Sequence, residues 1–166
     1  MLAFGILILG ILSRIIIHLP NFTPVIAIAL FSGVHFEKKQ ALTLPLILLA
    51  ISDIVIGFHN TMFFTWGSIL LIVTIGFWLR QHKNFRTILG ASVGSAVLFF
   101  IVSNLGVWIV GELYPLTAAG LQECFVMAVP FFKMTLLSTL IYTAVFFGSY
   151  EWIASRFKGK ELVRAL

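Results

Sequence analysis

Charged residues are scarce in this sequence. Lysine, arginine, aspartate and glutamate make up 10% of its 166 residues, whereas a soluble domain contains about 25%. A chain of this length buries only about two thirds of its surface on folding. An apolar share of 60% and a mean hydropathy of +1.09 therefore exclude a soluble enzyme and a disordered chain. The single cysteine, Cys124, excludes a disulfide-stabilised secreted scaffold, and the sequence predicts an integral membrane protein.

Long apolar runs are abundant. A helix needs about 20 apolar residues to cross the hydrocarbon core of a membrane, and the chain offers six candidate runs with no soluble domain between them. The second run is short for a span, and Pro24 suits its first turn, where a missing N–H costs nothing. We predict an all-α, polytopic membrane protein, a single domain over residues 1–166 with six transmembrane helices. These cover approximately residues 2–17, 24–36, 41–58, 62–79, 88–110 and 131–153.

The basic residues are distributed unevenly along the chain. Of the 11 lysines and arginines, most fall between runs two and three, between runs four and five, or after run six. Cytoplasmic loops carry an excess of lysine and arginine, so both termini are predicted to be cytoplasmic. The net charge of +5 then reflects topology and is not the footprint of a nucleic-acid partner. These residues are Lys38, Lys39, Arg80, Lys83, Arg86, Arg156, Lys158, Lys160 and Arg164.

Polar residues within the runs gather in the half of the helices that this orientation places outside. An ionisable side chain in the bilayer costs at least about 2.5 kcal/mol, and such residues face the bundle interior, pair with one another or line a wet cavity. We therefore predict a polar cavity open to the outside, with Asp53 paired to Arg14 or Lys133. Structural ion pairs without a ligand are the alternative. The candidate substrate-binding residues are Arg14, His18, Asn21, Asp53, Trp66, Asn104, Trp108 and Lys133.

The segment 112–130 is too long and too apolar for a simple loop. We interpret it as a short interfacial or re-entrant helix, with Thr117 as its N-cap residue, which covers the site as a lid. An amphipathic stretch resting on the lipid headgroups is an equally good interpretation.

Small residues recur at a spacing of four in two of the runs. Gly90 and Gly94 lie in run five, and Ala29 and Gly33 lie in run two. Such spacings let helices approach closely in lipid. We favour contacts within the bundle, with an external partner helix as the alternative.

Motifs for catalysis, cofactors and energy coupling are missing. The sequence contains no zinc or haem spacing, no phosphate-binding glycine loop and no ATPase motif. We therefore expect no enzyme activity, no cofactor and no metal. A soft metal held by His18, His59 and Cys124 at the outer face is a minor alternative; hydrogen-bonded loop residues are the favoured reading of these side chains.

Three stretches of the chain resemble a known family. They are SRIIIHLPNFTPVIAIALFSG (residues 13–33), SDIVIGFH (residues 52–59) and SNLGVWIVGELYPLTAAGLQECFVMAVPFF (residues 103–132). They resemble an uncharacterised bacterial family of membrane transport proteins, which is itself similar to the substrate-binding S components of energy-coupling-factor (ECF) vitamin transporters. The resemblance covers most of the chain and implies a six-helix, S-component-like bundle in the bacterial inner membrane, with a solute site near the outer face.

One departure from that family concerns the first run. S components often engage their transmembrane partner through an Ala-xxx-Ala pattern on the first helix. The first run here offers Ala3, Gly5, Gly10 and Ser13, which do not form that spacing.

The leading hypothesis is a solute-binding and uptake component for a small organic molecule such as a vitamin. In this hypothesis Asp53 and Asn104 hydrogen-bond the solute, Trp66 and Trp108 stack on it, and a basic residue neutralises an anionic group. The expected partners are the solute, the lipid bilayer, and an energising ATPase and transmembrane module or other membrane subunits, with no nucleic acid. The alternative is a small structural or assembly subunit of a larger membrane complex, in which the polar residues fix the helix register.

Overall fold

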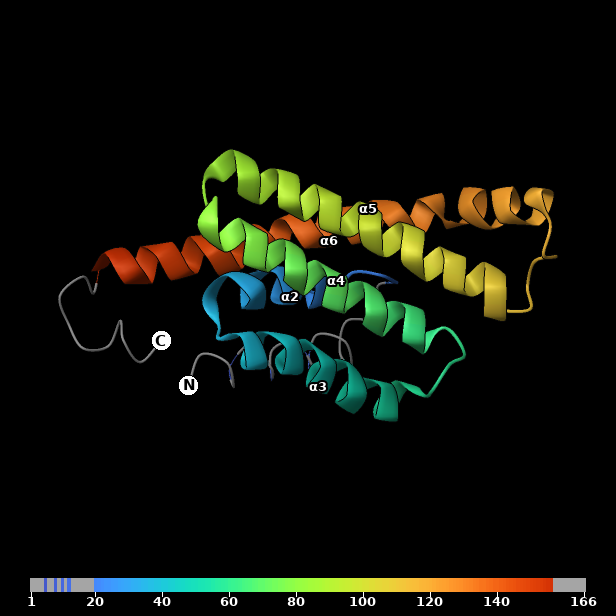
Figure 1. Cartoon of the computed structure of the whole chain (residues 1–166), viewed down its shortest axis with the longest axis horizontal. Coiled ribbons are helices and arrows are strands. Elements are labelled where there is room, and N and C mark those ends of the chain that lie inside the picture. Colours follow the sequence, from blue (N-terminus) through green and yellow to red (C-terminus); the bar gives the residue numbers. More distant parts are fainter. Residues whose placement is uncertain (1–4, 6–7, 9, 11, 13–19, 157–166) are drawn as a thin grey trace.

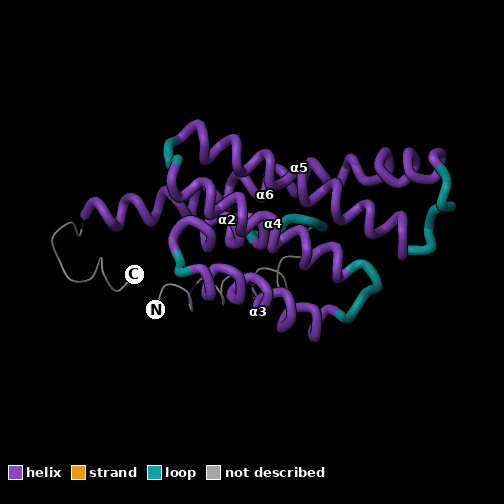
Figure 2. Tube along the Cα trace, in the orientation of Figure 1, coloured by secondary structure: helices purple, strands orange, loops and turns teal. Residues whose placement is uncertain are grey.

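The computed structural model describes residues 5, 8, 10, 12 and 20–156, and this part of the chain contains helices and no strand. The all-α prediction is thereby confirmed. The helices from α3 onward run in alternate directions along an elongated bundle, as Figures 1 and 2 show. In chain order the helices are α2 (Val25–His35), α3 (Lys38–Ile56), α4 (Met62–Gln81), α5 (Phe85–Val110) and α6 (Ala118–Arg156).

The four helices α3 to α6 are each long and apolar enough to cross a membrane. Their outward faces carry large apolar side chains, among them Ile54, Phe63 and Ile101, which are exposed on the bundle. Exposed apolar surface of this extent suits contact with lipid and not with water. The chain is therefore a membrane protein.

The prediction of six spans is not supported by the described residues. The second run forms α2, which has 11 residues and is therefore about 16 Å long, roughly half the thickness of the hydrocarbon core. The first run, predicted over residues 2–17, lies mostly outside the described residues; residues 5, 8, 10 and 12 are helical.

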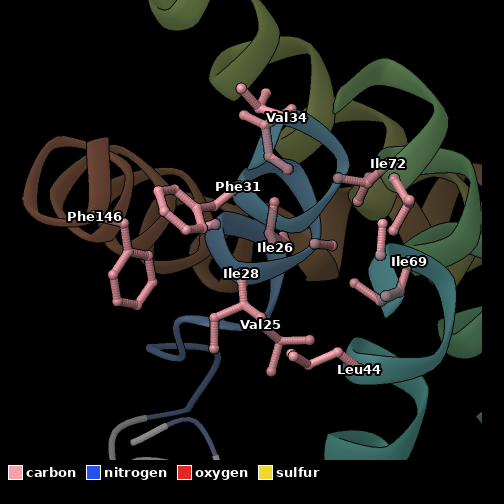
Figure 3. Close-up of a cluster of buried hydrophobic side chains, with 14 of the residues drawn as sticks. Val25, Ile26, Ile28, Phe31, Val34, Leu44, Ile69, Ile72 and Phe146 are labelled. Carbon is pink, nitrogen blue, oxygen red and sulfur yellow. The ribbon is translucent and has the colours of Figure 1, made fainter. Parts of the chain in front are cut away.

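Helix α2 forms the centre of the bundle and contacts all four longer helices. Its residues from Val25 to Val34 are buried, as expected for a helix that is apolar on every side. Figure 3 shows these side chains packed among residues of the neighbouring helices, including Leu44, Ile72 and Phe146.

The backbones of α2 and α4 approach each other very closely. A Cβ atom on Gly33 would lie 2.5 Å from the carbonyl oxygen of Val73 and 2.7 Å from the Cα of Gly76. The small residues of run two are thus used inside the bundle, as predicted. Close by, the Arg80 guanidinium donates hydrogen bonds to the carbonyls of Gly33 and Phe36, at the end of α2 where carbonyls have no helical partner.

Most basic residues of the described chain lie on one side of the bundle, here termed the basic end. Figure 1 shows the α2–α3 turn, the α4–α5 loop and the end of α6 on that side. The opposite end carries the loops 57–61 and 111–117. The residues of the basic end are Lys38, Lys39, Arg80, Lys83, Arg86 and Arg156.

Two helix boundaries differ from the prediction for identifiable reasons. Helix α3 ends at Ile56, two residues earlier than expected, because Gly57 has a φ of +111°, which L side chains rarely adopt. Helix α5 begins at Phe85, three residues earlier than expected, because Asn84 and Thr87 form a capping box that satisfies two free backbone N–H groups.

The segment 112–130 is not a separate lid helix. Thr117 is the N-cap, as predicted, since its Oγ1 accepts a hydrogen bond from the Gly120 N–H at 3.1 Å. The helix that begins there is α6, which continues through Pro130 for 39 residues. A proline removes one helical hydrogen bond, a loss that membrane helices tolerate, so Pro130 does not mark a helix boundary.

Candidate functional site

A pocket of about 490 Å³ lies between α4, α5 and α6 in the half of the bundle nearer the opposite end. Its wall is mainly apolar, with hydroxyl and carboxamide groups among aromatic rings. It is lined by Pro20, Asn21, Thr65, Phe99, Phe100, Ser103, Asn104, Val107, Leu113, Tyr114, Cys124, Met127, Ala128, Phe131, Phe132 and Thr135.

The pocket lies beside the N-terminus of α2. The chain turns at Pro20 and Asn21, which line the pocket, and α2 starts only at Val25. Asn21 adopts a φ of +60°, a left-handed conformation that asparagine tolerates better than most residues. The Ser138 hydroxyl of α6 shares its proton between the Thr135 carbonyl at 3.0 Å and the Asn21 carbonyl at 3.3 Å, which connects the turn to α6 beside the pocket.

The Asn104 side chain provides the main polar group on α5. Its Nδ2 donates to the Phe100 carbonyl, one turn earlier, at 2.7 Å. Its backbone carbonyl accepts the thiol of Cys124 at 3.5 Å, which links α5 to α6 at the pocket wall.

Three aliphatic hydroxyl residues, Thr65, Ser103 and Thr135, also line the pocket. Each donates to a carbonyl of its own helix, at 3.1 to 3.5 Å. Their protons are therefore engaged in these hydrogen bonds, and the hydroxyl oxygens can act only as acceptors toward a bound molecule.

The loop 111–117 lines the pocket at the opposite end through Leu113 and Tyr114. The Trp108 indole N–H donates to the Pro115 carbonyl at 3.0 Å, and Gly120 leaves no room for a Cβ because Pro115 packs against it. The loop is thus fastened to both α5 and α6. Trp108 was predicted to stack on a solute, but it is not among the described residues that line the pocket.

Asp53 and Trp66 contact each other and do not line the pocket. The Trp66 indole N–H donates to Asp53 Oδ2 at 3.0 Å, and Asp53 is only 1% exposed. Asp53 was predicted to pair with Arg14 or Lys133. Lys133 is exposed and no ion pair joins these two described residues, so the Lys133 alternative is not found. Arg14 and His18 lie outside the described residues.

Of the eight predicted site residues, the pocket brings together Asn21 and Asn104. Sequence reasoning missed the face of α6 that forms one wall, on which Cys124, Ala128 and Thr135 lie. Their spacings of four and seven are the helical repeat that could have revealed this face.

Metal ligands do not cluster in the described part of the chain, where no group of three or more His, Cys, Asp or Glu side chains could hold an ion.

The helices and the pocket define a class: an α-helical membrane protein with a cavity of small-molecule size. Over residues 1–162 the sequence matches a family described as a family of unknown function, DUF6580. The chain belongs to this family. No curated protein and no solved structure matches the sequence of this chain.

Proposed function

We propose that this protein binds a small organic solute and serves as the substrate-binding component of a membrane uptake system. The observation that carries the proposal is the pocket of about 490 Å³. Small-molecule sites are typically concave, about 300–1,000 Å³ in volume, and mostly apolar with a few polar groups that orient the ligand. The lining of this pocket has that composition.

The distribution of charge supports an orientation for the proposed binding protein. Lysine and arginine are enriched on the cytoplasmic side of membrane proteins, so the basic end would face the cytoplasm and the pocket the outside. We extend the proposal to six spans with both termini cytoplasmic, in a bacterial inner membrane. A pocket facing outward is what the first step of uptake requires.

An energising partner is part of the proposal. The resemblance of the sequence to the S components of ECF transporters supports a division of labour, in which this chain binds the solute and another module supplies energy. The proposed partners are the solute, the surrounding lipid and that membrane module.

Native mass spectrometry tests the proposal on protein purified gently from its own host membranes. We expect a retained small molecule of defined mass, and we expect Ala128→Phe to abolish its retention because the new ring occupies the pocket. Ala144→Phe is the matched control, since Ala144 lies on the same helix, is exposed and should keep the molecule.

Ser103→Leu gives an independent test from α5. The proposal fails if the unaltered protein carries no small molecule, or if both pocket variants retain as much as the Ala144→Phe control.

One observation favours a second function, that of a structural subunit in a larger membrane complex. Gly90 and Gly94 of α5 are exposed, and a Cβ at either would meet nothing within 4 Å. Small residues on an open face allow another helix to approach closely. Crosslinking from this face to one partner at constant stoichiometry, together with a pocket that retains nothing, would favour this second function.

A further inference from the structure

The aromatic side chains of the pocket form a wall that suits a flat ring. The centroid of the Phe100 ring lies 4.8 Å from that of Phe132, at an interplanar angle of 46°. Phe125, which does not line the pocket, packs against the same ring at 5.5 Å and 86°. Aromatic rings associate in such tilted and edge-to-face arrangements, with centroids about 4.5–7 Å apart. Phe99 and Phe131 add further ring surface to the pocket lining.

A carboxamide stands beside this wall. Asn104 follows Phe100 by four residues and therefore lies on the same face of α5. One of its N–H groups donates to the Phe100 carbonyl. Its second N–H and its Oδ1 make no hydrogen bond within the described part of the chain, so one donor and one acceptor remain side by side at the pocket.

Asn104 is half-buried, and a ligand with the complementary donor and acceptor can bond both of these atoms at once. An amide, a lactam or a ring nitrogen beside an N–H has that pair. We infer that the pocket takes a planar aromatic solute with an amide-type edge, the ring against Phe100 and the edge at Asn104. The inference rests on the proposed function and specifies the substrate class.

Cys124 provides a built-in reporter for the test. It lines the pocket and is the only cysteine of the chain. Because it is 2% exposed, we expect its alkylation to require entry of the reagent into the pocket. The rate of its modification by N-ethylmaleimide, followed by intact-protein mass spectrometry, reports occupancy of the pocket.

Three probes of similar size separate the two parts of the inference. Benzamide has the ring and the amide, cyclohexanecarboxamide has the amide on a saturated ring, and acetophenone has the ring without an N–H donor. At equal concentration we expect benzamide to slow modification at least about threefold more than either of the others, as ring and hydrogen-bond contacts each contribute.

Each result decides a defined point. Equal protection by cyclohexanecarboxamide would overturn the aromatic requirement, and equal protection by acetophenone would overturn the amide requirement. If benzamide gives no protection although native mass spectrometry finds a retained molecule, the substrate class is wrong and the binding function stands. If no molecule is retained either, the binding function falls as well.

A variant tests the role of Asn104 directly. Asn104→Leu keeps the size of the side chain and should remove the advantage of benzamide over acetophenone. Ser92→Ala is the control on the same helix, because Ser92 is buried away from the pocket and bonded to the Ile88 carbonyl. An undiminished advantage in Asn104→Leu would overturn the assignment of the amide edge to Asn104.

Discussion

The two halves of the bundle are packed in different ways. In the basic half, α2 fills the centre and lets Gly33 and Gly76 bring two backbones into contact. In the other half α2 is missing, and a pocket of about 490 Å³ lies between α4, α5 and α6. Helix α5 shows the contrast within one element: Ala91, Ser92, Ser95 and Ala96 are buried in its first half, but only Gly106 is buried in its second.

This difference shows how a short helix creates a site. A close-packed interior leaves few voids larger than a water molecule, so a cavity of this size needs a reason. Here the reason is that α2 spans about half of the bundle, and among the residues that the structure describes no other helix takes the central place in the second half. The basic half contributes the close packing that stabilises the bundle, and the other half contains the pocket.

The largest expected effect contrasts the tight α2–α4 crossing with an open helix face, both in the basic half, by adding the same bulk to each. Gly33→Leu should cost more than about 3 kcal/mol of unfolding free energy or prevent folding, because overpacking a tight core costs about 1–3 kcal/mol even for small additions. Gly90→Leu should stay within about 1 kcal/mol of the unaltered protein, since leucine is a good helix former and Gly90 faces open space. Unfolding in mixed micelles titrated with SDS measures both. Similar losses in both variants would contradict the difference between the crossing and the open face.

The next effect concerns the end of α2. Arg80→Ala removes the guanidinium that bonds the carbonyls of Gly33 and Phe36, and we expect a loss of about 2 kcal/mol, typical of hydrogen bonds to charged groups. Arg86→Ala is the control, because both arginines are exposed at the same end but the Arg86 side chain makes no hydrogen bond within the described part of the chain. The same SDS titration applies, and a stability unchanged by Arg80→Ala would show that α2 does not need this anchor.

A smaller effect is expected in the pocket half. Trp66→Phe removes the hydrogen bond to the buried Asp53 carboxylate and should cost about 1–2 kcal/mol. Trp108→Phe removes a hydrogen bond to Pro115 in an exposed setting and should cost less than about 1 kcal/mol, because water can replace the lost donor. Thermal unfolding monitored by circular dichroism should show a larger loss of stability for Trp66→Phe than for Trp108→Phe. A larger loss for Trp108→Phe would show that the contact of the loop 111–117 matters more than the Trp66–Asp53 contact.

The smallest expected effect on the unfolding free energy is that of a substitution in the pocket wall, which compares the packing of the pocket half with that of the basic half. Ala128→Leu places its added methylenes in existing space and should change the unfolding free energy by less than about 1 kcal/mol, since filling a cavity offsets the strain of insertion. Binding should nevertheless weaken. A loss of stability as large as that of Gly33→Leu would show that the pocket half is as tightly packed as the basic half.

The membrane class and most helices could be predicted from the sequence because they depend on hydropathy and local capping. The N-cap at Thr117 and the runs that became α3, α4 and α5 belong to this category. The continuation of α6 through Pro130 could not, since proline breaks helices in water but is tolerated where neighbouring helices support the backbone.

The site could be predicted only in part, for a geometric reason. Position along a helix gives the depth of a side chain, and depth alone correctly brought Asn21 and Asn104 to one region. The direction in which a side chain points around the helix axis depends on packing between helices. That direction decides that Trp66 meets Asp53, that Trp108 fastens a loop, and that neither lines the pocket.

Pro130 also determines how the pocket wall can deform. A proline cannot donate to the carbonyl four residues earlier, so α6 lacks one rung of its hydrogen-bond ladder at Val126. The pocket residues Cys124, Met127 and Ala128 come before the proline, and Thr135 comes after it. The wall therefore consists of two helical segments joined where one backbone hydrogen bond is missing, which is the place where a bend of α6 would cost least and would alter the width of the pocket.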